Sequence, residues 1–174
     1  MSEYLDYRKA DVFRNRGKGY TYFLLKWFRK AQFKKGKTSR HFYSFLYRVL
    51  SDFHGIEIPS SCRIGKGFAI FHPYNITINP NCVIGHNCDI HKGCLLGATN
   101  RGRRQGSPTI GNDVWIGPNV VIVGNIQIGD DVLIAGNAFV NVDVPSHSIV
   151  YGNPCIIKHS DFATEEYINN RVPE

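Results

Sequence analysis

The sequence predicts a parallel β-helix, in which the chain winds in stacked coils, preceded by a short basic helical segment. Branched apolar residues recur every six positions, a period that fits neither an amphipathic helix nor a β-hairpin and is the repeat of a parallel β-helix. Glycine often directly follows a repeat residue, where the chain turns tightly and a Cβ would crowd it. The repeat residues are Ile58, Ile64, Ile70, Ile76, Ile84, Ile90, Leu96, Ile110, Ile116, Ile122, Ile128, Ile134 and Val140. The glycines are Gly65, Gly85, Gly97, Gly111, Gly117 and Gly129.

The repeat is interrupted twice. Ile84 follows Ile76 by eight residues, and Ile110 follows Leu96 by fourteen. We therefore expect residues 97–109, a glycine-rich and basic segment, to leave the coil as a loop. A regular solenoid that tolerates one long insertion usually places it on the binding face.

Length and charge divide the chain into three parts. With 174 residues and 43% apolar residues, it has the composition of one ordinary domain with an appendage. Residues 1–55 hold 13 Lys/Arg and 4 Asp/Glu, whereas residues 56–174 hold 8 and 10. We expect a basic helical segment at 1–55, the β-helix at 56–158 and a tail at 159–174. The charge suggests an anionic partner for the first segment alone.

The first segment has a helical pattern, with a plausible N-cap at Ser39. Two roles remain open for it: it caps the open end of the β-helix and docks against a neighbouring subunit, or it rests on anionic lipid headgroups. Nucleic acid is not expected, because no recognised binding fold accompanies the charge. No apolar run is long enough for a membrane span or a signal peptide, so we expect a cytoplasmic protein with possible peripheral contact at the inner face of the membrane. The predicted apolar stripe consists of Phe42, Phe45, Leu46, Val49, Leu50 and Phe53.

The five cysteines are an odd set without secretory context, which favours a reduced compartment. Four of them stand two residues before a repeat residue, in a slot that suits a small hydrophobic side chain. The gaps between Cys82, Cys88 and Cys94 do not match structural zinc spacing, so we expect no metal there.

Two stretches carry a family resemblance. Residues 110–122 (IGNDVWIGPNVVI) and 144–154 (VPSHSIVYGNP) closely resemble the C-terminal half of hexapeptide-repeat acyltransferases. Residues 57–73 and 76–80, with IGKGFAIFHP and ITINP, resemble the serine acetyltransferase branch more narrowly. The resemblance covers about residues 55–158 and implies a left-handed parallel β-helix, a homotrimer, and acetyl-coenzyme A bound in grooves between subunits. The large helical domain of true serine acetyltransferases is not matched.

Acetyl transfer to a hydroxyl requires a base, donors for the developing oxyanion and a means of aligning both substrates. His72 suits the base, because imidazole titrates near neutrality. Glu57 lies fifteen residues earlier, close to one coil, so its carboxylate is expected to reach that ring from the adjacent coil and stabilise the imidazolium. The resemblance points to the same two positions as the catalytic residues.

The resemblance also implies positions that contact coenzyme A. Gly97, Ala98 and Thr99 match the glycine-rich turn whose amides approach the thioester. Lys158 is expected to meet the nucleotide phosphates, whereas Trp115 is expected to pack at the subunit face. Small residues that match the pantetheine groove are Gly117, Pro118, Ala135 and Gly136.

The acceptor site departs from the serine acetyltransferase pattern. In serine acetyltransferases Asp-Arg-His-Pro-Lys-Ile usually follows the insertion, but residues 105–110 of this chain read QGSPTI. Those enzymes also usually have an acidic residue directly before the catalytic histidine, whereas this chain has Phe71 there. Arg103 and Arg104 remain as possible acceptor contacts. An aromatic ring beside the base suits a sugar, so the pattern is more similar to O-acetyltransferases of capsule and exopolysaccharide pathways. Serine O-acetyltransferase is kept as the alternative.

Two other classes of function remain as alternatives. His86 and His91 have the spacing of two zinc ligands in γ-class carbonic anhydrases, which share the β-helix, and zinc would activate a bound water. A third histidine is expected one or two coils upstream, where the chain has Phe68 and Leu50. A non-catalytic scaffold is the other alternative. We expect no metal.

Overall fold

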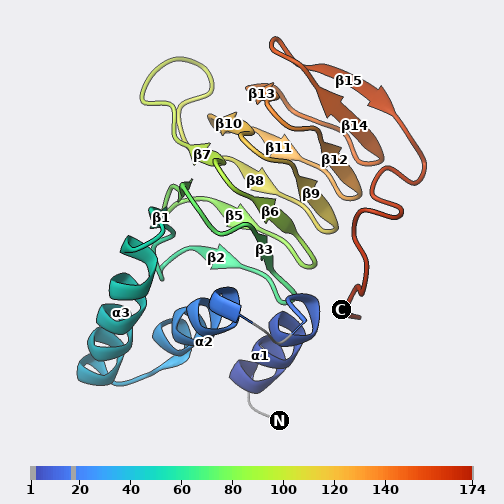
Figure 1. Ribbon diagram of the computed structural model, residues 1–174. Coiled ribbons are helices and arrows are strands. Elements are labelled where there is room, and N and C mark those ends of the chain that lie inside the picture. The colour runs from blue at the N-terminus through green and yellow to red at the C-terminus, as the bar shows by residue number, and fades with distance from the viewer. Residues whose placement is uncertain (1–2, 17–18, 174) are drawn as a thin grey trace.

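The computed structural model describes residues 3–16 and 19–173; residues 1, 2, 17, 18 and 174, included in the segments expected above, lie outside the described residues. Three helices pack under one end of a stack of short strands (Figure 1). They are α1 (Glu3–Arg14), α2 (Gly19–Phe33) and α3 (Lys37–Asp52). The strands form a parallel β-solenoid, and its hexapeptide repeats fit the left-handed β-helix that the sequence predicts.

The solenoid has three flat sides, which we name sheets A, B and C. From β1 to β13, successive strands visit the three sheets in turn, and neighbouring strands of a sheet are parallel and come from successive coils. Sheet A contains β1 (Ile56–Glu57), β4 (Ile76–Ile78), β7 (Leu95–Gly97), β10 (Val121–Val123) and β13 (Phe139–Val140). Sheet B contains β2 (Arg63–Ile64), β5 (Val83–Ile84), β8 (Thr109–Ile110) and β11 (Gln127–Ile128). Sheet C contains β3 (Ala69–Phe71), β6 (Asp89–His91), β9 (Val114–Ile116), β12 (Val132–Ile134), β14 (Ser148–Tyr151) and the antiparallel β15 (Ile156–His159).

The six-residue repeat forms the core. Every repeat residue is buried, and equivalent residues stack in register, as in the pairing of Ile70 with Ile90 and of Ile90 with Ile116. Four cysteines fill the adjacent slots as free, buried thiols, as expected: Cys62, Cys82, Cys88 and Cys94. Burial raises the pKa of the Cys88 thiol to about 12, because the thiolate would lose its water.

One column of glycines is explained by close approach between coils. A Cβ on Gly85 would lie 2.5 Å from the carbonyl oxygen of Gly111, and one on Gly111 would lie 2.7 Å from the carbonyl oxygen of Gly129. The left-handed turns are instead made by short polar residues, including Asn87, Asp113 and Asp131 with φ between 51° and 55°. The glycines of this column therefore keep the coils at sheet spacing rather than supply an unusual φ.

The insertion leaves the coil as predicted. Thr99 and Gly106 exchange two backbone hydrogen bonds of 2.9 and 3.0 Å, which makes the base of a hairpin. The hairpin projects from the solenoid beyond β7 (Figure 1). Its tip carries arginines into solvent.

Side chains from α2 and from the end of the α1 segment contact the first coil, while the choice between subunit docking and lipid contact stays a prediction. A strand at the end of a solenoid has unpaired backbone groups that need partners when buried. Arg29 donates to the carbonyl oxygens of Ile64 and Gly65 at 2.7 and 2.6 Å. Asn15 accepts from the amide of Ile70 at 3.1 Å.

Two buried ion pairs hold these caps. The Asp11 carboxylate forms an ion pair with the Arg29 guanidinium at 2.7 Å and also accepts a hydrogen bond from the amide of Phe68 at 3.1 Å. Arg14 contacts Asp89 and donates to the carbonyl oxygen of Gly67. All four charged side chains are buried, so each charge depends on its partner.

Helix α3 differs from expectation in two ways. It begins at Lys37 after an N-cap at Gly36, and the Ser39 hydroxyl donates to the Gly36 carbonyl oxygen within the first turn, so the predicted N-cap was wrong. The helix buries Tyr47 and Ser51. Most of the predicted apolar stripe is exposed: Phe42 57%, Phe45 63%, Val49 41% and Phe53 79%. None of the described helices is long and apolar enough to cross a membrane.

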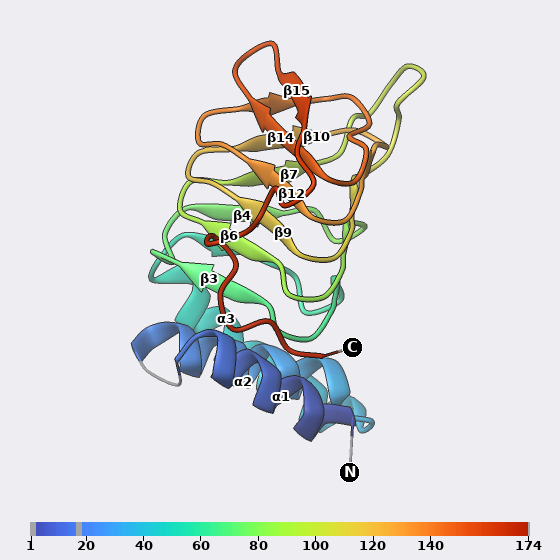
Figure 2. The same cartoon turned by 90° about the vertical axis from the view of Figure 1, so that its right-hand side faces the viewer.

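The C-terminal tail returns along the outer side of sheet C toward α1 (Figure 2). Asp131 accepts hydrogen bonds from the amides of Ala163 and Thr164 at 3.1 and 3.0 Å. Farther along, Val172 and Asn87 exchange two hydrogen bonds of 3.0 Å each. The tail thus spans the coils from β12 down to the helical cap.

Candidate functional site

His72 occupies a strained turn at the corner where sheet C leads into sheet A. It follows β3 directly, its φ is 52°, and its carbonyl oxygen accepts from the amide of Tyr74 at 2.7 Å. A left-handed conformation in a non-glycine residue costs free energy and is concentrated at functional sites. The turn leaves His72 exposed, which the expected role of a base requires.

Glu57 lies on the adjacent coil, as the fifteen-residue spacing predicts. It is exposed on β1 and pairs in register with Thr77, which follows the His72 turn along the chain. No hydrogen bond joins Glu57 to His72 among the described residues. Their direct contact therefore stays a prediction.

The small residues expected in the pantetheine groove lie in one line above His72. The turns that follow β3, β6, β9, β12 and β14 stack at the same corner, and we name this line the corner ridge. The amide of Gly93 donates to the carbonyl oxygen of Tyr74 at 3.0 Å, and the amide of Asn119 donates to that of Lys92 at 2.9 Å. The ridge comprises residues 72–75, 92–94, 117–119, 135–137 and 151–154.

The upper ridge is narrow because small residues form it. The amide of Asn137 donates to the carbonyl oxygen of Pro118 at 2.9 Å, and a Cβ on Gly136 would lie 3.1 Å from that oxygen. Gly117 and Ala135 are the first residues of the same two turns. Lys158 stands at the top of the ridge, with its Nζ 5.7 Å from the ring centroid of Tyr151. From the coil of β3 to that of β14 the ridge rises about 19 Å, since coils are about 4.8 Å apart.

The glycine-rich turn lies at the other edge of sheet A. Gly97 ends β7, and its carbonyl oxygen accepts from the amide of Gly124 at 3.2 Å. Ala98 and Thr99 then begin the hairpin. The corner ridge and this turn are therefore separated by the width of sheet A within one chain.

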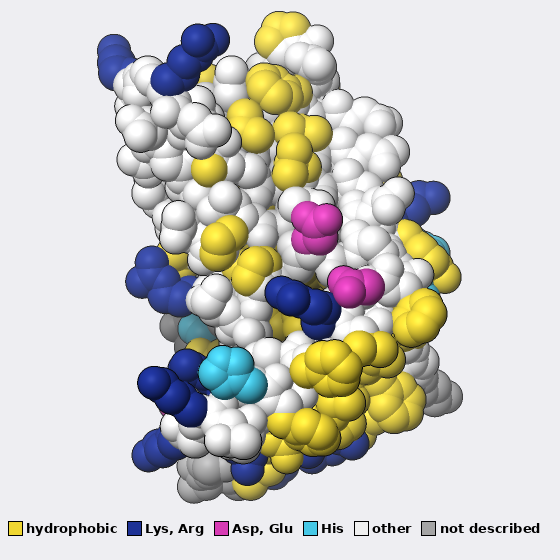
Figure 3. Space-filling view, turned by 90° about the vertical axis from the view of Figure 1, so that its left-hand side faces the viewer, with side chains coloured by type: hydrophobic (Ala, Val, Ile, Leu, Met, Phe, Trp, Pro, Cys, Tyr) yellow, Lys and Arg dark blue, Asp and Glu magenta, His cyan; other side chains and the backbone are white. Residues whose placement is uncertain are grey.

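The face between these two edges is largely apolar. Leu95, Val121 and Phe139 pair in register along sheet A with side chains that are at least partly exposed. Figure 3 shows hydrophobic side chains running up the solenoid and gathering again over the helical end. Such a face suits contact with another protein surface.

Of the three residues expected to contact the acceptor, two already have side-chain partners within the chain. The ring of Phe71 stacks on His91, with centroids 5.1 Å apart, and His91 in turn contacts Trp115. Arg104 lies 3.5 Å from Asp143, whereas the exposed Arg103 has no side-chain partner among the described residues. Trp115, expected at the subunit face, also packs on Tyr167 of its own tail, with centroids 5.0 Å apart.

The two histidines of the zinc alternative are engaged with the backbone. His86 Nδ1 accepts from the amide of Lys66 at 3.1 Å, and His91 Nδ1 lies 3.0 Å from the carbonyl oxygen of Ile116. Burial lowers the pKa of His91, because the charged ring would lose water. Among residues 3–16 and 19–173, no three His, Cys, Asp or Glu side chains gather as metal ligands would. Phe68, where a third histidine was sought, is part of the core.

Sequence reasoning overlooked Lys92. It is exposed on the corner ridge in the coil directly above the His72 turn. The first coils repeat every 20 residues, as the pairing of Ile70 with Ile90 shows, so counting 20 residues from His72 would have found it.

Comparison with known proteins identifies the family of the chain. Residues 107–141 match the family described as bacterial transferase hexapeptide (six repeats). The colanic acid biosynthesis acetyltransferase WcaB of Escherichia coli K12 is 41% identical over 115 residues, which cover 65% of this chain and 70% of WcaB. Serine acetyltransferase 4 of Arabidopsis thaliana is 37% identical over 105 residues, 60% of this chain.

The structural relatives agree. The apoenzyme structure of soybean serine acetyltransferase superposes with a TM-score of 0.76 and 26% identity, covering 89% of this chain and 69% of the soybean chain. The matched segment spans only 30% of the Arabidopsis enzyme. Because WcaB is matched over most of its length, the chain belongs to the hexapeptide-repeat acetyltransferase family.

Proposed function

We propose that the protein is an acetyl-coenzyme A-dependent O-acetyltransferase that acetylates a sugar hydroxyl in surface polysaccharide biosynthesis. The observation that carries the proposal is the corner ridge, with exposed His72 at its foot, small residues along it and Lys158 at its top. An extended thioester lying on the ridge would place its nucleotide phosphates near a cation and its acyl group near a base.

The chemistry requires a proton carrier and an oxyanion site. His72 removes the hydroxyl proton as the acceptor oxygen attacks the thioester carbonyl, and Glu57 stabilises the resulting imidazolium. A backbone amide beside Gly97 holds the oxyanion. The Thr99 amide does not contribute as expected, because it donates to the Gly106 carbonyl oxygen at 2.9 Å. The C–S bond then breaks, and His72 returns its proton to the departing thiolate. The products are the acetyl ester, free coenzyme A and a neutral His72.

A homotrimer would bring the separated parts together. His72 and the Gly97 turn lie at opposite edges of sheet A, so a neighbouring subunit docked on the apolar face could supply the missing edge. We therefore propose that the site forms between subunits. Light scattering should find a trimer in solution, and a fully active monomer would contradict this arrangement.

The exposed side of α3 has two proposed occupants. It offers apolar side chains to a neighbouring subunit, and the basic helices around it suit anionic lipid headgroups. If lipid is the occupant, the protein should co-sediment with anionic liposomes at low ionic strength and release as salt screens the charges. Absence of salt-sensitive binding would leave the subunit contact.

Three features favour a sugar acceptor. WcaB is named for colanic acid biosynthesis, which supports a polysaccharide substrate here. The charged residues expected to hold a free amino acid are absent from 105–110, and a zwitterion leaving water needs charge-assisted hydrogen bonds in return. Arg103 is exposed on the hairpin, has no side-chain partner among the described residues, and suits an acidic sugar.

Serine O-acetyltransferase is the second candidate, favoured by the likeness to the plant enzymes. An acceptor screen that follows thiol release from acetyl-coenzyme A separates the two. We expect efficient release with a glycan or nucleotide-sugar acceptor and poor release with L-serine. Efficient turnover of L-serine with no sugar accepted would reverse the choice.

A further inference from the structure

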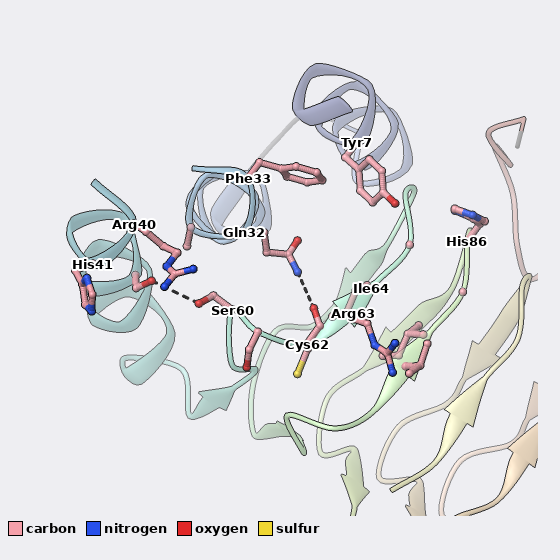
Figure 4. Close-up of a pocket in the computed structure, with 17 residues that line it drawn as sticks. Tyr7, Gln32, Phe33, Arg40, His41, Ser60, Cys62, Arg63, Ile64 and His86 are labelled. Carbon is pink, nitrogen blue, oxygen red and sulfur yellow. Dashed lines mark hydrogen bonds between the residues drawn. The ribbon is translucent and has the colours of Figure 1, made fainter. Parts of the chain in front are cut away.

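A cavity lies on the opposite side of the solenoid from the corner ridge. It has a volume of about 820 Å³ and is bounded by the helices and by sheet B. Figure 4 shows Tyr7, Gln32 and Arg40 reaching it from the three helices, with Arg63 and His86 on the solenoid. This volume is within the range of small-molecule sites, which is about 300–1,000 Å³.

The charge of the cavity has one sign. The charged side chains that line it are Arg40 and Arg63, and no Asp or Glu is among the described lining residues. The exposed side chains of Arg40 and Arg63 make no hydrogen bond or ion pair with any described residue. This contrasts with Arg29, which is buried and fully engaged in the helical cap.

The neutral groups of the cavity add hydrogen bonding to this charge. His86 Nδ1 accepts from the Lys66 amide at 3.1 Å, so the neutral ring carries its proton on Nε2 and can donate there. The hydroxyl groups of Ser44 on α3 and of Ser60 both line the cavity and lie 3.4 Å apart. Gln32 is fixed in place because its Nε2 donates to the Cys62 carbonyl oxygen at 2.7 Å.

We propose that this cavity binds a phosphate group carried by a polar ligand, as a site separate from the acetyl-transfer site. Arginine pairs with phosphate oxygens through two parallel hydrogen bonds, and two unpaired arginines without a competing carboxylate favour a dianion over a single carboxylate. The hydroxyl groups suit the polar remainder of the ligand. The source is a free organic phosphate or a lipid headgroup, and the test distinguishes them.

The probe is inorganic pyrophosphate, titrated into the full-length protein by calorimetry at low ionic strength. We expect saturable binding that weakens as chloride is raised. Arg40→Gln and Arg63→Gln should each weaken binding about tenfold, and the double variant about a hundredfold. Both side chains are exposed and unpaired, so these variants should fold, which circular dichroism checks.

Two matched controls separate this site from other cations. Arg101→Gln removes a charge from the hairpin tip, and Lys158→Gln removes the cation proposed for coenzyme A; neither should change pyrophosphate affinity more than twofold. No binding by the wild-type protein to either pyrophosphate or lipid, or equal losses in the control and cavity variants, would overturn the proposal.

A second arm identifies the source of the phosphate. Vesicles of phosphatidylcholine with phosphatidylglycerol are compared with vesicles of phosphatidylcholine alone. Binding to the anionic vesicles that the double variant loses supports a lipid headgroup, whereas pyrophosphate binding without vesicle binding supports a soluble ligand. Vesicle binding that the double variant retains, with no pyrophosphate binding, would contradict a phosphate site in this cavity.

Discussion

Replacing Arg29 by methionine should strongly destabilise the junction between the helices and the solenoid. Arg29 is 1% exposed, pairs with Asp11 and donates to the carbonyl oxygens of Ile64 and Gly65. Methionine fills much of the space but leaves one buried carboxylate and two buried carbonyl groups without this donor. Removing one partner of a buried ion pair typically costs about 3–5 kcal/mol.

A companion variant tests whether the charge is responsible. Burial raises the pKa of Asp11, and Arg29 opposes that shift, so the carboxylate is costly once the arginine is gone. Asp11→Asn combined with Arg29→Met removes the charge while keeping an oxygen for the Phe68 amide. We expect the double variant to recover part of the loss, because a buried pair replaced as a unit is far less costly than a broken pair.

The assay is urea denaturation followed by circular dichroism at one fixed protein concentration, since assembly contributes to apparent stability. Arg171→Met is the matched control: that side chain is 44% exposed and pairs with Asp113 at 3.0 Å, so its loss should cost about 1 kcal/mol or less. If Arg29→Met costs no more than Arg171→Met, the helices do not stabilise the solenoid through these contacts.

Three further predictions concern the site, the corners and the tail. His72→Ala should lower the acetyl-transfer rate about 10²–10⁴-fold at nearly unchanged coenzyme A affinity, while His86→Ala stays near wild type; abolished activity in the second variant would contradict the assigned base. Gly111→Ala should lower stability by about 1–3 kcal/mol in thermal unfolding, because the new Cβ would lie 2.7 Å from backbone of the next coil. Burial raises the pKa of Asp131, but hydrogen bonds from Thr164 and its neighbours lower it by more, so the pKa of Asp131 lies below its ordinary value. The tail is therefore stabilised above about pH 4 and loses that contribution as pH falls through the lowered pKa. Hydrogen exchange of the Thr164 amide should show this loss in the wild type, and Asp131→Asn should show weak protection at every pH.

The solenoid was predictable because its signal is local and repeated. Each repeat residue, such as Ile90, occupies the same inward position, so thirteen weak observations agree on one fold. The small residues of the ridge were implied by the family resemblance and not by the register, which only places them in successive coils. The hairpin could be predicted as a departure from the coil, but the antiparallel bridge between Thr99 and Gly106 could not.

The cap could not be predicted in detail. Asp89 and Arg14 are 75 residues apart, and an arginine in a basic helix normally faces solvent. The stripe of α3 misled for a related reason. Helical periodicity identifies an apolar face but not the surface that covers it, and here Phe53 is left exposed while Tyr47 is buried. Long-range pairing, rather than local pattern, decides both features.

The last strand of sheet C has a consequence for aggregation. Because β15 runs antiparallel to β14, it interrupts the parallel stacking that every earlier coil continues. An uncovered parallel edge would present a ready template for the first coil of another molecule, and end-to-end addition of this kind would build a fibre. At the other end, Arg29 and Asn15 bind backbone groups of β2 and β3, the first strands of sheets B and C, which such a fibre would need. The length of the solenoid is thus limited by its two ends, and loss of either closure should promote polymers rather than a longer functional stack.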